Sequence, residues 1–204
     1  MANLSETNSS PADADDRLAN IKILVMDSSS DAAALIKKIF VQLGFTNVVV
    51  ANDGFSGVQA VKEGDVNLIF TDRELKVVWN AENALEVSKA RTGEVLPLSG
   101  VLFTQRLRQS SNSPNPYLPV IMMLDGVTEE DVGAARDSGV NEVLTRPIQA
   151  DDFCKRIISI IDNPRLFIAQ DNYKGPCRRR KKDTISDDVK ERRVRKMRVM
   201  KVEQ

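Results

Sequence analysis

The chain has 204 residues, of which 42% are hydrophobic, so it is long enough for one packed domain with additional segments. Its 29 Lys and Arg balance 29 Asp and Glu, and it has no histidine, which excludes a Ser-His-Asp or Cys-His catalytic site built from this chain alone. Cys154 and Cys177 lack metal-ligand spacing, and no apolar stretch reaches the roughly 18 residues of a membrane span, so we expect a cytoplasmic protein that is not an enzyme.

The chain begins with residues 1–19, which are rich in Ser, Asn, Ala and Asp and are interpreted as a disordered acidic leader. Ile21–Met26 is an apolar run of strand length. Apolar residues at helical spacing over Asp31–Leu43 predict a helix that Gly44 ends. The fold therefore starts with a strand followed by a helix.

The same alternation continues to residue 161. Further strands are predicted over Asn47–Ala51, Leu68–Thr71, Pro119–Leu124 and Glu142–Thr145. Further helices are predicted over Gly54–Lys62, Gly100–Arg108, Glu129–Ser138 and Ala150–Ile161. Alternating strands and helices imply right-handed crossovers and a parallel sheet covered on both faces. We therefore predict an α/β domain over residues 20–163, with a doubly wound five-stranded parallel sheet.

One segment, about residues 76–98, interrupts this alternation where a short loop is expected. Ala81–Ala90 within it has a helical pattern, so we expect a helical insertion after the third strand. Loops above roughly 12 to 15 residues are usually functional or flexible. Trp79, the only tryptophan, either packs the insertion onto the domain or contacts a partner.

Three predicted strands end on residues suited to phosphoryl chemistry. Asp27 follows the first strand, Asp72 the third and Arg146 the fifth. Ligands of open parallel sheets bind in the crevice at the carboxyl ends of the strands. We therefore expect Asp27, Asp72 and Arg146 to share one pocket.

With these elements placed, residues 21–161 resemble the CheY-like receiver domain of two-component response regulators. The stretches that carry the resemblance are Ile-Leu-Val-Met-Asp27, Leu-Ile-Phe-Thr-Asp72, Leu-Pro119-Val-Ile-Met-Met, Ala-Ala-Arg-Asp-Ser-Gly139-Val and Leu-Thr-Arg146-Pro147. The stretches Ser113-Pro-Asn-Pro-Tyr-Leu-Pro119, Asn163-Pro-Arg-Leu-Phe and Gly175-Pro-Cys-Arg-Arg-Arg further resemble stand-alone alphaproteobacterial receivers. The family implies a flavodoxin-like strand order, 2-1-3-4-5.

The resemblance also implies a chemistry. Asp72 would accept a phosphoryl group from the phosphohistidine of a sensor histidine kinase or phosphotransfer protein. Mg²⁺ would be held by Asp27, the Asp72 side chain and the backbone carbonyl of Glu74, because a carboxylate attacking an anionic phosphoryl group needs its charge neutralised. The signal would pass to a downstream signalling protein. The resemblance also implies a possible homodimer through the face over Glu129–Ile161.

Several residues depart from the family pattern. Ser28 replaces a second acid, which weakens the expected Mg²⁺ site. Leu124 replaces the Thr or Ser hydroxyl that hydrogen-bonds the phosphoryl group, and Arg146 replaces a lysine, keeping the charge but not the geometry. Asp125 is an extra acid that either pairs with Arg146, repels an incoming phosphoryl group or is simply solvated, and Val143 replaces the aromatic ring of the usual switch.

Two versions of the receiver function remain open. In one, Asp72 is phosphorylated and the signal passes through altered loops or the insertion. In the other, the chain is a phosphorylation-independent pseudo-receiver that acts as a scaffold or adaptor. Loss of the threonine-type hydrogen bond removes part of the contact difference that a two-state switch needs.

The segment 164–204 is predicted to be a basic C-terminal tail. Residues 174–204 hold 13 Lys and Arg against 5 Asp and Glu, leaving 16 and 24 in the rest of the chain. Such clusters attract phosphates or acidic proteins through a salt-dependent interaction. The tail is interpreted as a solubilising arm, a docking segment for an acidic partner, or least favourably a nucleic-acid contact, since no helix-turn-helix is evident.

Overall fold

The computed structural model describes residues 18, 20–75, 78–79, 96–97, 99–126, 128–162, 164–170, 173–178 and 198–200. Most of the predicted leader, the predicted helix over Ala81–Ala90 and most of the predicted basic tail lie outside the described residues. The predictions for those segments therefore stay predictions.

The main sheet has five parallel strands in the order β2-β1-β3-β6-β7. In chain order, the strands are β1 (Lys22–Met26), β2 (Val48–Ala51), β3 (Val66–Asp72), β6 (Val120–Asp125) and β7 (Glu142–Arg146). This is the predicted doubly wound sheet with strand order 2-1-3-4-5. The inner strands are almost wholly buried, which explains why their sequences are continuously apolar rather than alternating.

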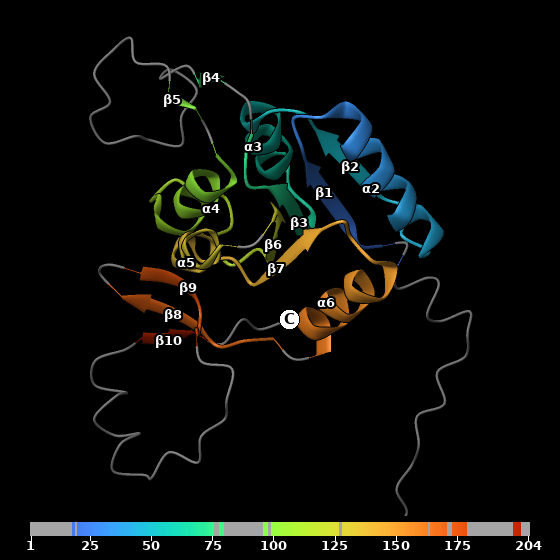
Figure 1. Cartoon of the computed structure of the whole chain (residues 1–204). Coiled ribbons are helices and arrows are strands. Elements are labelled where there is room, and N and C mark those ends of the chain that lie inside the picture. The colour runs from blue at the N-terminus through green and yellow to red at the C-terminus, as the bar shows by residue number, and fades with distance from the viewer. Residues whose placement is uncertain are drawn as a thin grey trace, which may run out of the picture.

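Helices cover both faces of this sheet, as Figure 1 shows. The helices are α2 (Ser30–Gln42), α3 (Gly54–Lys62), α4 (Gly100–Gln109), α5 (Glu129–Ser138) and α6 (Ala150–Asp162). Helices α2 and α6 contribute to one hydrophobic cluster, and α3, α4 and α5 to the other. The sheet therefore lies between two cores, and its strand ends are left to form a site.

Short polar side chains begin four of the helices. The Ser29 side chain accepts from the Ala32 backbone N–H, and Asp53, Ser99 and Thr128 cap α3, α4 and α5 in the same way. Each cap satisfies a backbone N–H that has no partner within its helix. These caps place the turns directly after the strands, and Ser29 lies two residues beyond Asp27.

An aromatic cluster joins helices α2 and α6 to the centre of the sheet. The rings of Phe40 and Phe70 lie 4.8 Å apart edge to face, and Phe153 of α6 lies 4.5 Å from Phe40 and 4.9 Å from Phe70. All three side chains are buried. The cluster fixes α6 against β3, the strand that ends on Asp72.

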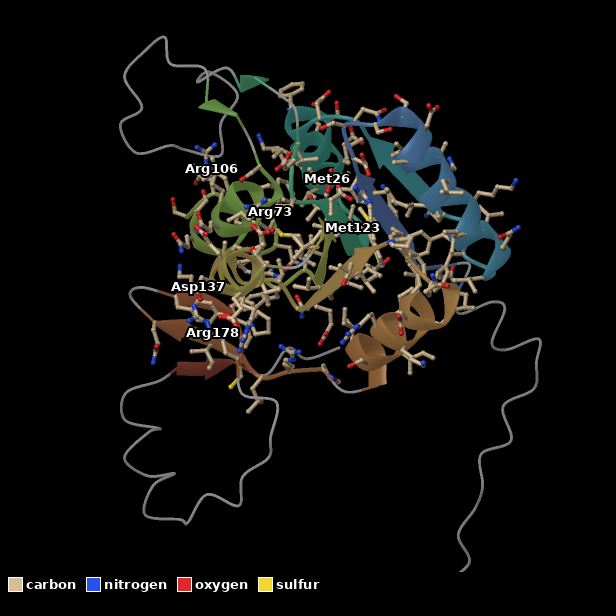
Figure 2. All side chains as sticks on the ribbon, viewed as in Figure 1. Met26, Arg73, Arg106, Met123, Asp137 and Arg178 are labelled. Carbon is tan, nitrogen blue, oxygen red and sulfur yellow. The ribbon has the colours of Figure 1, made fainter. Side chains whose placement is uncertain are left out.

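The segment after α6 contains strands that the sequence patterns did not predict. Strands β8 (Phe167–Gln170) and β9 (Tyr173–Pro176) pair antiparallel, and β10 (Arg198–Met200) pairs with β8. Figure 2 shows Arg178, just after β9, beside Asp137 of α5, and their side chains form an ion pair of 3.0 Å. Part of the segment interpreted as a basic tail is therefore folded against α5.

Arg108 of α4 is a buried cation that holds this junction together. Its guanidinium donates to the carbonyl oxygens of Gly139 and Pro116, at 3.0 and 2.6 Å, and to the Asn141 side chain at 3.2 Å. It also lies 5.6 Å from the Phe167 ring centroid. Burial lowers the pKa of Arg108 to about 9. Its contacts join α4, the turn after α5 and the β8–β9 hairpin.

The described ends of the insertion lie near the end of β3. Strand β4 (Val78–Trp79) pairs antiparallel with β5 (Leu96–Pro97). The Gly100 backbone N–H then donates to the Arg73 carbonyl at 2.8 Å, so the chain returns next to the residue that follows Asp72. Among the described helices, none has the length and apolar character needed to cross a bilayer.

Candidate functional site

Asp27 and Asp72 lie at the carboxyl ends of the adjacent strands β1 and β3 and are both buried. The apolar residues before each aspartate anchor the strand in the core, so the carboxylate is presented at the rim of the sheet. Two carboxylates with little access to water cannot both be ionised without a nearby positive charge.

Arg146, at the end of β7, supplies that charge. Its Nη2 hydrogen-bonds Asp27 Oδ2, and its Nη1 lies 3.5 Å from Asp72 Oδ1. The same Nη1 donates to both carboxylate oxygens of Asp125, at 3.2 and 3.3 Å. The structure therefore brings Asp27, Asp72 and Arg146 together, and of the alternatives for Asp125 it shows the pairing with Arg146.

Asp27 is held from both of its carboxylate oxygens. Its Oδ1 accepts from the Ser29 backbone N–H at 2.9 Å, while its Oδ2 contacts Arg146. Its backbone carbonyl accepts from the Asn52 side chain at 2.9 Å. The orientation of Asp27 is thus fixed by α2, by the loop after β2 and by β7.

Asp72 has an unusual protonation equilibrium. Burial raises its pKa to about 6, Asp27 and Asp125 add to the increase, and Arg146 and the Arg73 backbone N–H oppose it. The carboxylate is therefore mostly ionised at neutral pH but takes up a proton in mild acid. Burial lowers the pKa of Arg146, but Asp72, Asp27 and Asp125 outweigh it and leave that pKa above its usual value.

The residues expected to hold Mg²⁺ are already engaged with one another. Asp27 and Asp72 both face Arg146, and the Glu74 carbonyl accepts a hydrogen bond from Ser28 Oγ at 3.3 Å. Among the residues that the structure describes, no group of three or more His, Cys, Asp or Glu is placed to hold a metal ion. As arranged, this donor set does not fit an octahedral divalent ion, which needs free carboxylate and carbonyl oxygens.

Leu124 occupies the position beside the site where the resemblance expects a hydroxyl. Its side chain is buried in the core cluster that contains Leu24 and Met26, and its strand neighbour across the sheet is Thr145. It also borders a small cavity of about 30 Å³ next to Asp72. Leucine offers no hydrogen bond to a group placed there.

One site feature was missed by sequence reasoning. Arg73 directly follows Asp72, and its guanidinium forms an ion pair of 2.7 Å with Asp131 in the first turn of α5. Figure 2 shows Arg73 on the side of the sheet that carries α4 and α5. The sequence signal available was only the position of Arg73 after Asp72, because the approach of α5 depends on the packing of the helices.

A second, larger cavity of about 320 Å³ lies at the opposite ends of the strands. It is bordered by residues at the starts of β1, β3 and β7, by the end of α6 and by the segment after it. Within its wall, Glu142 is buried and forms ion pairs with Arg156 and Arg165. This cavity is remote from Asp72, because it borders the amino ends of the strands and Asp72 lies at the carboxyl end of β3.

Comparisons with known proteins agree with this fold. The chain is 24% identical over 143 residues to the chemotaxis protein CheY-3 of Vibrio cholerae, covering 70% of this chain and 93% of that protein. The receiver domain of sensor histidine kinase PA1611 from Pseudomonas aeruginosa PAO1, with magnesium ion coordinated in its active site cleft, has 19% identity and a TM-score of 0.52, covering 69% and 96% of the two chains. No protein-family model matches the chain.

A third comparison concerns a receiver bound to a partner. The co-crystal structure of the Saccharomyces cerevisiae histidine phosphotransfer protein Ypd1 with the receiver domain of its downstream response regulator Ssk1 matches with a TM-score of 0.52 and 21% identity. The match covers 69% of this chain and 88% of that chain. The fold of this chain is that of CheY-like receiver domains, and the relatives that it resembles are signalling proteins and receiver domains of two-component systems.

Proposed function

We propose that this protein is an atypical response-regulator receiver that accepts a phosphoryl group on Asp72. A carboxylate oxygen of Asp72 attacks the phosphorus of a partner's phosphohistidine, and the P–N bond breaks. The electron pair stays on the imidazole nitrogen, which takes up a proton. The observation that carries the proposal is the ionisable Asp72 carboxylate at the end of β3 with Arg146 beside it.

Arg146 has the chemistry to assist this transfer. A guanidinium presents several N–H donors in one plane, so it can contact a phosphoryl oxygen while still facing a carboxylate. Its Nη1 already lies near both Asp72 and Asp125. We propose that Arg146 stabilises the charge on the transferred group, and that Asp125 yields its contact with Arg146 when the group arrives.

Magnesium has a reduced role in this proposal. The solved receiver of Pseudomonas aeruginosa holds magnesium, but here Ser28 replaces an acid and Arg146 faces both remaining carboxylates. We propose that this site binds Mg²⁺ weakly. Phosphoryl transfer to Asp72 then depends on Arg146 rather than on the ion.

The direct test is labelling of Asp72. Incubation with the phosphorylated form of a histidine kinase or phosphotransfer protein should give acid-labile phosphate on the wild type and none on Asp72→Asn. Asp152→Asn, a change at an exposed aspartate of α6, is the matched control and should label like the wild type. Absence of labelling with a broad panel of donors would contradict the proposed acceptor role.

A second function is favoured by one observation, the buried Leu124 where a hydroxyl would contact the phosphoryl group. Without that contact, the phosphorylated and unphosphorylated states differ less in energy, and the domain acts as a phosphorylation-independent scaffold or adaptor. This function predicts that Asp72→Ala keeps the affinity for a partner isolated with the wild type. A large loss of affinity, measured by calorimetry, would favour the phosphorelay function instead.

A further inference from the structure

The pocket lined by Asp27, Asp72 and Asp125 already contains a positive charge, the guanidinium of Arg146. This guanidinium lies among the carboxylates, as a bound cation would. Asp27 Oδ2 contacts Arg146 Nη2, while Asp72 Oδ1 and Asp125 lie on the side of Nη1. One guanidinium thus faces three carboxylates that come from the ends of β1, β3 and β6. A divalent ion placed between Asp27 and Asp72 would have to displace these contacts.

The Glu74 carbonyl, the backbone oxygen expected to bind Mg²⁺, is also engaged within the protein. Ser28 stands where an acid would supply a further oxygen ligand, and its Oγ instead donates to the Glu74 carbonyl at 3.3 Å. A carbonyl oxygen that accepts this hydrogen bond presents less free electron density to a metal. Two residues that differ from the family pattern therefore bind the expected metal ligands. Arg146 pairs with the carboxylates of Asp27 and Asp72, and Ser28 donates to the Glu74 carbonyl.

We propose that the Arg146 guanidinium takes the place of the divalent cation in this pocket, and that Ser28 completes the arrangement. The pocket is then neutralised from within, and its assembly does not depend on Mg²⁺. This inference deepens the proposed function because it names the charge that would accompany phosphoryl transfer. It differs from a merely weakened site, since removal of Arg146 should create metal affinity rather than reduce it.

Electrostatics predicts that the Mg²⁺ affinity rises when Arg146 is replaced by a neutral residue. In the wild type, an incoming Mg²⁺ meets a fixed positive charge at close range and carboxylates that are already paired. Replacing Arg146 with neutral glutamine removes the repulsion and frees Asp27 and Asp72. Adding Ser28→Asp in that background supplies a further carboxylate beside Asp27 and releases the Glu74 carbonyl.

The test is isothermal titration calorimetry with MgCl₂ at constant ionic strength. The wild type should show no saturable binding over the millimolar range, while Arg146→Gln should bind at least about tenfold more tightly. The double variant Ser28→Asp with Arg146→Gln should bind more tightly still. Lys155→Gln, which removes one exposed positive charge from α6, is the matched control and should behave like the wild type.

The outcomes separate this inference from the proposed function. Saturable Mg²⁺ binding by the wild type, or an affinity that Arg146→Gln leaves unchanged, would overturn the inference whether or not Asp72 is phosphorylated. If circular dichroism shows that Arg146→Gln does not fold, Arg146→Lys replaces it. A lysine ammonium cannot face Asp27 and Asp125 with separate nitrogens, so its Mg²⁺ affinity should also exceed that of the wild type, and no increase would overturn the inference. Labelling of Asp72 that fails in all conditions would remove the proposed function but not these binding results.

Discussion

Gly100, the first residue of α4, lies against the backbone of Asp72. A Cβ built on Gly100 would be 2.1 Å from the Asp72 carbonyl oxygen and 2.9 Å from Thr71 Oγ1. The Thr71 hydroxyl itself donates to that carbonyl at 3.0 Å. The start of α4 therefore fixes the position of the proposed phosphoacceptor, and only a residue without a side chain fits there.

Gly100→Ala should lower the free energy of unfolding by about 2 kcal/mol, because the new methyl group meets backbone that cannot move independently. Urea unfolding followed by circular dichroism measures the change. Gly133→Ala in α5, where a Cβ meets nothing within 4 Å, is the matched control and should be neutral or stabilising by about 0.5 kcal/mol. Equal effects of the two substitutions would contradict the close approach of α4 to Asp72.

Arg146→Ala should be strongly destabilising, because it leaves the buried Asp27 carboxylate without the cation that faces it. Removing one partner of a buried ion pair typically costs about 3 kcal/mol or more. The Lys155→Ala control removes an ion pair at 4.0 Å whose two side chains are 74% and 62% exposed, and should cost less than about 0.5 kcal/mol. Denaturant midpoints at constant m-value test both; a small effect of Arg146→Ala would show that the pocket does not need this guanidinium.

The raised pKa of Asp72 predicts how stability changes with pH. Because its folded pKa of about 6 exceeds the value of 3.8 taken for an unperturbed aspartate, protonated Asp72 favours the folded state. The stability that protonated Asp72 contributes is fully present below its pKa in the unfolded chain, and it is lost as the pH rises through about 6. Relative to Asp72→Asn, the wild type should therefore lose on the order of 3 kcal/mol between about pH 4 and pH 7.

Unfolding curves measured across this range check the prediction. The comparison with Asp152→Asn, a substitution of an aspartate whose side chain is 62% exposed, controls for the general effect of removing a carboxylate. If the difference between the wild type and Asp72→Asn were constant with pH, the environment described for Asp72 would be incorrect.

The ion pair between Arg73 and Asp131 predicts a local effect on α5. Arg73→Gln should loosen the first turn of α5, because the pair at 2.7 Å ties that turn to the end of β3. Hydrogen exchange of the amides over 129–138 should become faster near Asp131. Arg178→Gln, which removes the pair with Asp137, is the matched control and should act near the other end of the same helix. The same exchange pattern in both variants would contradict separate anchoring of the two ends.

The five-stranded core and the positions of the strand ends could be predicted from the sequence patterns. Continuous apolar runs such as Ile23–Met26 can only be buried on both faces, and the helices between them require parallel strands. Because parallel strands end at one rim of the sheet, Asp27, Asp72 and Arg146 could be assigned to one pocket before their contacts were known.

The ion pairs and hydrogen bonds that these residues form could not be predicted from the sequence and depend on the packed fold. The pairing of Arg146 with Asp125 and of Ser28 with Glu74 depends on side-chain directions that no periodicity specifies. The contact of Arg73 with Asp131 and the docking of the β8–β9 hairpin on α5 depend on which distant surfaces meet. Local patterns encode burial and direction along the chain, whereas these contacts arise from packing between segments far apart in sequence.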